Sequence, residues 1–249
     1  MTSCLGRTCR LLSIAVKSRR FLAMDTPSID IQSIRAKYAN KQEPYLLEDK
    51  LPTTNPFELF DLWFRDVAAQ SDLTFEEINA VSVATVGKDL RPSSRMVLLK
   101  AYDLHGFSFY TNYTSRKGQQ IDENPNAAML FYWPKVNRQV RVEGTIEKLP
   151  NEAAVAYWNS RPLASRIGSK SSDQSTVVPD RKFLEDKKAS LTELSIREGA
   201  ASITKPDSWG GFQLIPRYFE FWQGQSDRLH DRIVFERDTD IWLLKRLSP

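Results

Sequence analysis

The chain has very little thiol or imidazole chemistry. Its 249 residues include two cysteines and two histidines, and Cys4 and Cys9 both lie within the first 24 residues. Beyond that segment the protein can form no disulfide, no cysteine nucleophile and no thiolate metal site. His105 and His230 alone are too few to build a zinc centre, so we expect no metal site.

Long apolar runs and the common nucleotide-binding motifs are also missing. The longest candidate run, Leu11–Val16, is far shorter than the roughly 18 apolar residues of a membrane-spanning helix, so we expect no membrane anchor. The sequence contains no G-x-G-x-x-G or G-x-x-x-x-G-K-[ST] motif, no G-x-S-x-G elbow and no H-E-x-x-H pair. An enzyme with so few nucleophilic and acid–base groups would need a cofactor for its difficult step.

Acidic residues are absent from the first 24 positions, and the first one is Asp25. The same segment carries five basic residues: Arg7, Arg10, Lys17, Arg19 and Arg20. A mitochondrial presequence has this composition, and so does an untargeted tail or an extension upstream of a start at Met24. We predict a cytoplasmic protein, with mitochondrial targeting through residues 1–24 as the alternative.

The positive net charge belongs mostly to this leader. The whole chain has 35 basic and 31 acidic residues, a net charge of +4 and a pI near 9.0. Without the five leader cations, 30 basic residues stand against 31 acidic ones. The basic pI is therefore poor support for nucleic-acid binding, and we expect no nucleic-acid partner.

Composition divides the chain into three segments. Residues 1–24 are the basic leader, residues 25–54 are a polar, proline-containing arm, and residues 55–249 are expected to form a single domain. Asn55-Pro56 is a typical helix start, with an asparagine cap and a proline in the first turn. The apolar residues that follow share one helical face, which predicts a helix packed on a core: Phe57, Phe60, Trp63, Phe64 and Val67.

From about residue 79 the apolar period changes to two, which predicts strands separated by turns. The expected strands are 80–86, 94–101, 107–111, 127–133, 138–147, 211–222, 232–237 and 241–246. The expected helices are 115–123, 152–160 and 180–197. This rhythm favours a mainly β protein with flanking helices, in which antiparallel strands form a barrel.

Several segments carry cations where a strand or a helix start does not need them. Arg95 and Lys100 flank an apolar strand on opposite faces, and Arg116-Lys117 stands at the start of an expected helix. Helix N-termini favour anions, so a bound phosphate would explain both groups of cations. Solvated strand ends and exposed surface charge are the alternatives.

Two further groups of polar residues suggest ligand contacts. Gln139 lies on the polar face of an alternating strand, where it either binds the edge of a heterocycle or meets solvent. Tyr157, Arg161 and Ser165 are spaced by four, and the first two share a helical face, whereas Ser165 is expected in the loop after Pro162. A hydroxyl, a guanidinium and a second hydroxyl would make a second phosphate site.

Residues 222–232 are the segment densest in functional side chains. Arg228, His230 and Arg232 alternate, which would place all three on one side of a strand. Three potential cations on one face repel one another unless an anion or an electron-rich ring lies there. We therefore expect a functional site at this position.

Together these segments resemble the pyridoxine/pyridoxamine 5'-phosphate oxidase family. The resemblance runs from about Ile34 to Pro249 and rests on ordered strings: Ser94–Lys100, Ser115–Gly118, Phe131–Trp133, Asn137–Gly144, Ser160–Pro162, Ser208–Gly211, Phe221–Gln225, Arg228–Arg232 and Arg246–Pro249. It implies a split β-barrel homodimer with flavin mononucleotide (FMN) at the subunit interface. It also implies a vitamin B6 salvage reaction, in which pyridoxine and pyridoxamine 5'-phosphates are oxidised to pyridoxal 5'-phosphate. Oxygen is reduced to hydrogen peroxide, and the amine also releases ammonia.

The resemblance assigns roles to the matching positions. The implied FMN-binding residues are Arg95, Met96, Val97, Leu98, Tyr110, Thr111, Arg116, Lys117, Gln139, Gln174, Ser175, Trp222 and Arg232. The implied substrate-binding residues are Lys100, Tyr157, Arg161, Ser165, Arg228 and His230, with Arg35 and Tyr38 on an arm that closes over the substrate. Arg228 and His230 are the implied catalytic pair. The chain departs from the family pattern in the polar stretch 167–175, which bears on Gln174 and Ser175.

Two other functions stay open on the sequence alone. A nicotinamide-dependent FMN reductase on a similar barrel would not need Lys100, Tyr157, Arg161 and Ser165. A non-enzymatic carrier of flavin or pyridoxal phosphate would bind its ligand without releasing peroxide.

Overall fold

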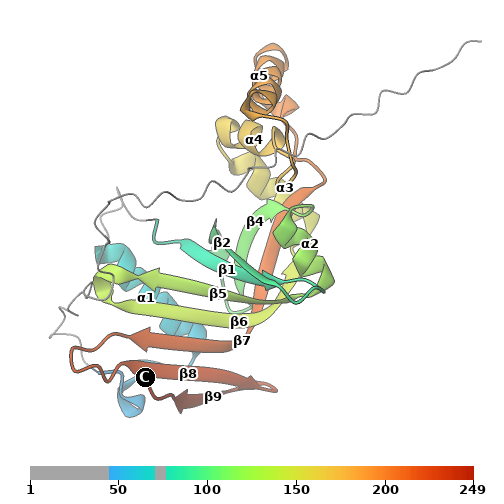
Figure 1. Cartoon of the computed structure of the whole chain (residues 1–249). Helices are drawn as coiled ribbons and strands as arrows, with labels where there is room; N and C mark the ends of the chain where they lie inside the picture. Colours follow the sequence, from blue (N-terminus) through green and yellow to red (C-terminus); the bar gives the residue numbers. More distant parts are fainter. Residues whose placement is uncertain (1–44, 71–76) are drawn as a thin grey trace, which may run out of the picture. The chain divides into compact units, whose positions relative to one another are not determined.

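The computed structural model describes residues 45–70 and 77–249, which form a curled antiparallel sheet with helices around it (Figure 1). The strands are β1 (Ala80–Val86), β2 (Pro92–Leu98), β3 (Ala101–Tyr102), β4 (Phe107–Asn112), β5 (Asn126–Trp133), β6 (Arg138–Lys148), β7 (Trp209–Gln223), β8 (Asp231–Asp238) and β9 (Ile241–Arg246). The helices are α1 (Pro56–Gln70), α2 (Arg116–Glu123), α3 (Asn151–Ser160), α4 (Leu163–Lys170) and α5 (Arg181–Glu198), with short 3-10 helices η2 (Glu48–Lys50), η3 (Pro134–Val136) and η4 (Ala200–Ser202). None of the helices in these described ranges is both long and apolar enough to span a membrane.

Strand β7 joins two parts of the sheet. Its first half, Trp209–Leu214, pairs with β4, and its second half, Tyr218–Gln223, pairs with β8, while β6 runs along its other edge. The strand order is β2-β1-β5-β6-β7-β4-β3, with β8 and β9 added beside the second half of β7. One long strand therefore carries separate neighbours at its two ends, and these ends hold different groups of functional residues.

The register of β6 against β7 shifts between Glu143 and Gly144, so the pair contains a β-bulge there. A Cβ atom on Gly144 would lie 1.9 Å from the carbonyl oxygen of Ile215, so only glycine lets the two backbones approach this closely. Pro216 stands opposite Gly144, and proline is tolerated in a sheet at such irregular positions. The bulge bends the strands where β7 changes partner from β4 to β8.

Helix α1 packs on the buried face of the sheet. Alternation along β1 buries Val81 and Val83 completely. The Phe60 ring of α1 lies 4.8 Å from the Phe107 ring of β4 and 5.0 Å from the Phe131 ring of β5. Burying a ring of this size stabilises the fold by roughly 1.5–3 kcal/mol. The predicted apolar face of this helix is confirmed, because its members all join the main core: Phe57, Phe60, Trp63, Phe64 and Val67.

A smaller apolar cluster fixes the helices that follow β6. Trp158 of α3 and Ile167 of α4 are buried with Ile203 and Trp209. The indole nitrogen of Trp158 donates to the carbonyl oxygen of Ile203 over 2.9 Å, which satisfies its buried N–H group. This cluster packs α3 against β7, and Figure 1 shows α4 next to α3. These two helices and their junction carry three of the expected substrate residues: Tyr157, Arg161 and Ser165.

The mainly β architecture with flanking helices is confirmed, but two local predictions are wrong. The expected strand 94–101 is split into β2 and β3, because the backbone changes partner at its end. The N–H of Leu99 donates to Asn79, before β1, whereas the N–H of Lys100 donates to Ser108 of β4, both over 2.8 Å. Ser165 lies in helix α4 rather than in a loop. The residue before a proline disfavours the helical conformation, so Arg161 is extended, and the helix resumes at once after Pro162.

Candidate functional site

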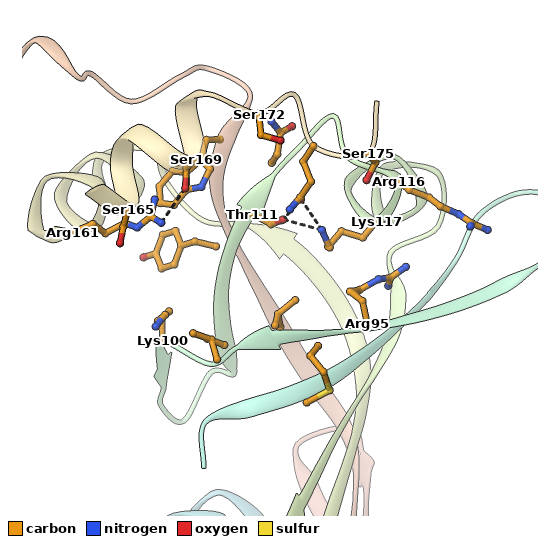
Figure 2. A pocket seen from close by; sticks show the side chains of 18 of the residues that line it. Arg95, Lys100, Thr111, Arg116, Lys117, Arg161, Ser165, Ser169, Ser172 and Ser175 are labelled. Atoms are coloured by element: carbon orange, nitrogen blue, oxygen red, sulfur yellow. Dashed lines mark hydrogen bonds between the residues drawn. The ribbon is translucent and has the colours of Figure 1, made fainter. Parts of the chain in front are cut away.

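A cavity of about 1030 Å³ lies between β2, β4, α2 and the α3–α4 region. Five cationic side chains line it, and no aspartate or glutamate is among its described lining residues. Figure 2 shows Lys100, Arg161 and Ser165 on one side of this cavity and Arg95, Arg116 and Lys117 on the other. We call this the cationic cavity. So much unbalanced positive charge in a partly enclosed space is costly unless an anion binds there.

Lys117 is the most buried of these cations, with 8% of its surface exposed. Its Nζ donates to the Gln174 side-chain oxygen over 2.8 Å and to the Thr111 and Ser115 hydroxyls over 3.1 and 3.4 Å. All three acceptors are neutral. Burial, together with the charge of Arg95, lowers the pKa of Lys117 to about 8. An anion bound beside Lys117 would supply the missing negative charge.

The start of helix α2 adds backbone donors to this side of the cavity. Ser115 caps the helix, and its hydroxyl accepts from the N–H of Gly118 over 3.4 Å. The first turn of α2 contains no acidic residue and begins with Arg116-Lys117. Exposed N–H groups and the helix dipole favour an anion at such an end. A Cβ atom on Gly118 would lie 2.0 Å from the Tyr113 carbonyl oxygen, so glycine lets the helix start against β4.

Arg95 is fixed by neutral groups as well. Its guanidinium donates to the Val83 carbonyl over 3.0 Å and to the Thr85 and Ser93 hydroxyls over 2.7 and 2.6 Å. Burial, together with the charge of Arg116, lowers the pKa of Arg95 below its ordinary value. The sequence therefore places two arginines and a lysine close together without a carboxylate partner in the cavity. This arrangement fits a doubly charged phosphate.

Arg161 forms the opposite side of the cavity. Its guanidinium carbon lies 5.1 Å from the Trp209 ring and 5.4 Å from the Trp158 ring, and Nη2 donates to the Ser169 hydroxyl over 3.0 Å. Its Nη1 atom is buried and has no hydrogen-bond partner. Burial lowers the pKa of Arg161, which is the direction expected for a cation without a counterion. An unsatisfied buried donor of this kind marks the place of a missing acceptor.

Aromatic rings line the cavity beside Arg161. The Tyr110 and Tyr157 rings stack with centroids 4.1 Å apart, and Tyr110 also stacks on Trp209 at 5.4 Å. Burial raises the pKa of Tyr110. The cavity can therefore hold flat, apolar ring systems between two anion-binding ends.

The structure brings most of the expected ligand residues to this one cavity. Those that line it are Arg95, Met96, Val97, Leu98, Lys100, Tyr110, Thr111, Arg116, Lys117, Tyr157, Arg161, Ser165, Gln174 and Ser175. Sequence reasoning missed other lining residues, including Ser93, Asn112, Ser169, Ser172 and Trp209. The polar stretch 167–175, which departs from the family pattern, contains Ser169 and Ser172 and is the signal that could have identified them. Arg35 and Tyr38 lie outside the described residues.

A second group of expected residues lies elsewhere, on the face of the sheet opposite the core. Gln139 of β6, Trp222 of β7 and Arg232 of β8 are direct cross-strand neighbours and line a smaller cavity of about 270 Å³. Arg232 pairs with the buried carboxylate of Glu220 over 2.7 Å, and Arg141 pairs with the same carboxylate over 2.6 Å. Burial acts to raise the pKa of Glu220, but the hydrogen bonds from Arg232 and Arg141 outweigh it and lower the pKa.

Arg228 and His230 lie in the turn between β7 and β8. The prediction that they share a strand face with Arg232 is wrong, because β8 begins only at Asp231 and strand alternation does not apply before it. Arg228 has a φ of 68°, in the left-handed region. The Nδ1 atom of His230 accepts a hydrogen bond from the backbone N–H of Gln225 over 3.0 Å, and its ring lies 5.0 Å from the Trp222 ring. Neither Arg228 nor His230 is among the residues that line the two cavities.

The chemistry of the site is therefore that of ligand binding and orientation. Within residues 45–70 and 77–249, no three His, Cys, Asp or Glu side chains gather where they could hold a metal ion. The cationic cavity offers cationic donors on two sides and aromatic rings beside Arg161, and a separate face carries Gln139, Trp222 and the Arg228–His230 turn.

Two family models match the chain. The model described as pyridoxamine 5'-phosphate oxidase covers residues 68–195. The model described as the pyridoxine 5'-phosphate oxidase C-terminal dimerisation region covers residues 209–249. The first contains the lining residues of the cationic cavity apart from Trp209, and the second contains Trp222, Arg228, His230 and Arg232.

Individual proteins show the same similarity. A Caenorhabditis elegans protein provisionally named pyridoxamine 5'-phosphate oxidase is 83% identical over 226 residues, which are 91% of this chain and 100% of that protein. The pyridoxine-5'-phosphate oxidase of Bos taurus is 44% identical, over 92% of each chain. The crystal structure of PhzG from Burkholderia lata in complex with tetrahydrophenazine-1-carboxylic acid has a TM-score of 0.76. It is 30% identical and covers 84% of this chain and 98% of that one. The predicted split-barrel fold is confirmed.

Proposed function

The chain belongs to the pyridoxamine 5'-phosphate oxidase family, and we propose that it oxidises pyridoxine 5'-phosphate and pyridoxamine 5'-phosphate to pyridoxal 5'-phosphate with FMN and O2. One observation carries this proposal above all. The cationic cavity combines five cations with no carboxylate among its described lining residues, and Arg161 Nη1 lies there buried and unsatisfied. Two phosphate esters of flat ring compounds would satisfy both features.

The two sides of the cavity divide between the two phosphates. Arg95, Arg116, Lys117 and the N-terminus of α2 would hold the FMN phosphate, since Lys117 is the most buried cation of the cavity and the backbone N–H groups of a helix start lie beside it. The substrate phosphate would bind at the other end, where the donors are Lys100, Tyr157, Arg161 and Ser165. When bound, FMN would supply hydride acceptance from the substrate's 4' carbon and electron transfer to O2, which yields hydrogen peroxide. With the amine substrate, water would then hydrolyse the oxidised imine and release ammonia.

The rest of the site would come from a second copy of the chain. Gln139, Trp222, Arg228, His230 and Arg232 do not line the cationic cavity of their own chain, and four of them belong to the matched dimerisation region. The sheet face that carries Gln139 also exposes apolar side chains, with Tyr132 61% and Leu130 37% exposed. We propose a homodimer in which this face of one copy covers the cavity of the other.

The protein's contribution to the reaction is then mainly orientation. Fixing both phosphates holds the reacting rings in one arrangement, which lowers the entropic cost of the encounter. Arg228 would cover the far face of the substrate ring, and its charge would polarise the reacting substituent. Because Nδ1 of His230 accepts from Gln225, the neutral imidazole carries its proton on Nε2, where it can donate to the substrate or take part in proton movement.

Steady-state turnover tests the proposal. Purified protein supplied with FMN should release peroxide with both phosphorylated substrates, and far less with pyridoxine, because unphosphorylated pyridoxine leaves Arg161 unsatisfied. Oxidation of NADH without turnover of either phosphate ester would contradict the proposal and favour an FMN reductase. Binding of FMN without any peroxide release would favour a carrier.

A further inference from the structure

A single arginine of the last strand fastens the N-terminal part of the described chain to the Arg228–His230 turn. Arg246 of β9 pairs with the Glu48 carboxylate through Nε at 2.6 Å and Nη2 at 3.1 Å, and Nη2 also donates to the Leu46 carbonyl. Its Nη1 donates to Asp231 Oδ1 over 2.8 Å. One guanidinium therefore joins η2, β8 and β9.

Asp231 connects Arg246 to the turn through a second hydrogen bond. It is 3% exposed, and its Oδ2 accepts from the side-chain amide of Gln225 over 2.6 Å and from the backbone N–H of Leu46 over 3.2 Å. Gln225 is itself buried, and its backbone N–H is the donor to His230 Nδ1. A continuous series of contacts thus runs from Arg246 through Asp231 and Gln225 to His230.

The segment before η2 contacts the same turn from its other side. The Tyr45 hydroxyl donates to Asp227 Oδ2 over 3.3 Å, and Asp227 Oδ1 accepts from the backbone N–H of Leu229 over 2.9 Å. Arg228 lies between Asp227 and Leu229 in the sequence. Residues 45–48 are therefore attached on both sides of the turn that carries the two expected catalytic side chains.

Removal of Arg246 would leave the Asp231 carboxylate buried without its cation. A buried carboxylate without its cation is costly, so either the side chain should move or the contacts around it should rearrange. Either change alters the hydrogen bond to Gln225 and hence the direction in which the His230 ring is held. Arg246 is not among the residues that line the two cavities, so it would act on the site through Asp231 and through the residues 45–48 that it holds.

We propose that Arg246 is a positioning residue, which holds His230 in its working orientation through Asp231 and Gln225 and fixes residues 45–48 to the same turn. This inference rests on the proposed oxidase function for its kinetic consequence. Its geometric part, the coupling of Arg246 to His230, is independent of any activity.

The kinetic test compares Arg246→Gln with Lys245→Gln. Lys245 is the neighbouring residue of β9 and pairs with Glu236, with both side chains about half exposed, so it is a matched control. We expect Lys245→Gln to retain wild-type kcat/KM. Arg246→Gln should lose about 10- to 100-fold in kcat, the equivalent of one charge-assisted hydrogen bond, with FMN affinity unchanged. Arg246→Lys should recover part of the loss, since it keeps the charge but not the two-pronged geometry.

A double-mutant comparison shows whether the effect passes through His230. In a His230→Ala background, Arg246→Gln should cause little further loss, because the group that it positions is already gone. A full additional loss in that background would overturn the proposal, and so would wild-type kcat in Arg246→Gln.

A spectroscopic test keeps the inference separate from the proposed function. The chain has only two histidines, so ¹⁵N imidazole signals of His230 can be assigned with a His105→Asn variant. In the full-length holoprotein, Nδ1 of His230 should show an accepted hydrogen bond that weakens in Arg246→Gln and Arg246→Lys but not in Lys245→Gln. A wild-type protein without oxidase turnover but with this pattern would refute the function alone. An identical His230 spectrum in all variants would refute the positioning role.

Discussion

Lys117 and Gln174 meet inside the cationic cavity, where Lys117 Nζ donates to the Gln174 side-chain oxygen over 2.8 Å across 57 residues of sequence. This contact joins the start of α2 to the polar stretch after α4. It also shows the electrostatic character of the site, because a buried lysine is held by an amide and two hydroxyls rather than by a carboxylate. Burial of Lys117 without a carboxylate partner lowers the stability of the ligand-free protein. A bound anion would offset this cost.

The first prediction concerns the stability of the ligand-free protein. Since the pKa of Lys117 is lowered to about 8 in the folded state, the unfolded chain binds more protons than the folded one between roughly pH 8 and the ordinary lysine pKa near 10.4. Stability should therefore rise with pH through this window. Lys117→Met should raise the unfolding midpoint at pH 7 and remove this rise, as measured by thermal unfolding of the apoprotein. The surface control Lys182→Met, which loses only an exposed pair with Asp186, should leave both unchanged.

The same substitution should weaken FMN binding. The loss of a charge-assisted hydrogen bond to a phosphate corresponds to about 10- to 100-fold in Kd. Wild-type affinity should also fall as pH rises above the lowered pKa of Lys117, whereas the Lys117→Met protein should show a flatter profile. Flavin fluorescence titration measures both. Equal FMN affinity in the variant and the wild type would exclude Lys117 from the phosphate site.

Arg161→Met should act on the substrate and not on the cofactor. Its Nη1 is the unsatisfied donor that we assign to the substrate phosphate, so kcat/KM for pyridoxine 5'-phosphate should fall by about 10- to 100-fold or more. FMN affinity should stay the same, because Arg161 lies on the other side of the cavity from Lys117 (Figure 2). Arg181→Met on the exposed face of α5 is the control. A loss confined to FMN affinity would reverse our assignment of the two anion sites.

The backbone conformation of Arg228 should lower the stability of the folded protein, while its side chain serves the reaction. Its φ of 68° is costly for a residue with a Cβ atom, by about 1–2 kcal/mol, and glycine avoids that cost while losing about 0.4–1 kcal/mol to unfolded-state entropy. Arg228→Gly should therefore be at least as stable as Arg228→Ala in urea unfolding, although both lack the side chain and should be equally impaired in turnover. Clearly lower stability of Arg228→Gly would mean that this turn is not strained.

A complementation experiment tests whether two chains share each site. The Arg161→Met and His230→Ala homodimers should each have strongly reduced activity. A heterodimer that contains one chain of each kind should regain one intact site, because Arg161 and His230 would then come from different chains. The control heterodimer pairs a wild-type chain with the Arg161→Met/His230→Ala double variant and should have no intact site. The opposite pattern would place both residues in the site of the same chain.

The sequence predicts the site better than it predicts how the site is assembled. Alternation identified the strands, and the adjacent cations Arg116-Lys117 identified a helix start that faces the cavity. Alternation could not show that the backbone changes its hydrogen-bonding partner at Leu99. This change brings Lys100 to the same cavity as Arg95. Such crossings depend on which strands pair, and pairing is a long-range property that local periodicity does not contain.

Residues 228 and 230 show a second limit. Their spacing predicts a shared strand face, but the chain forms a left-handed turn at Arg228 that arginine rarely adopts, and the turn is held by buried contacts of Gln225 and Asp231. The serines of the α4 region were missed for a related reason. Ser169 lies in α4 and Ser172 follows it, and this region is placed by the packing of Trp158, Ile167 and Trp209, which local periodicity does not contain.

Anaerobic mixing of the purified holoprotein with pyridoxine 5'-phosphate tests the central proposal most directly. The protein should be yellow with bound FMN. Its flavin absorption should bleach on addition of the phosphate ester and return when O2 is admitted. One molecule of peroxide should form for each flavin that is reoxidised. A colourless protein that takes up no FMN, or a bound flavin that stays oxidised in the presence of the substrate, would contradict the proposal.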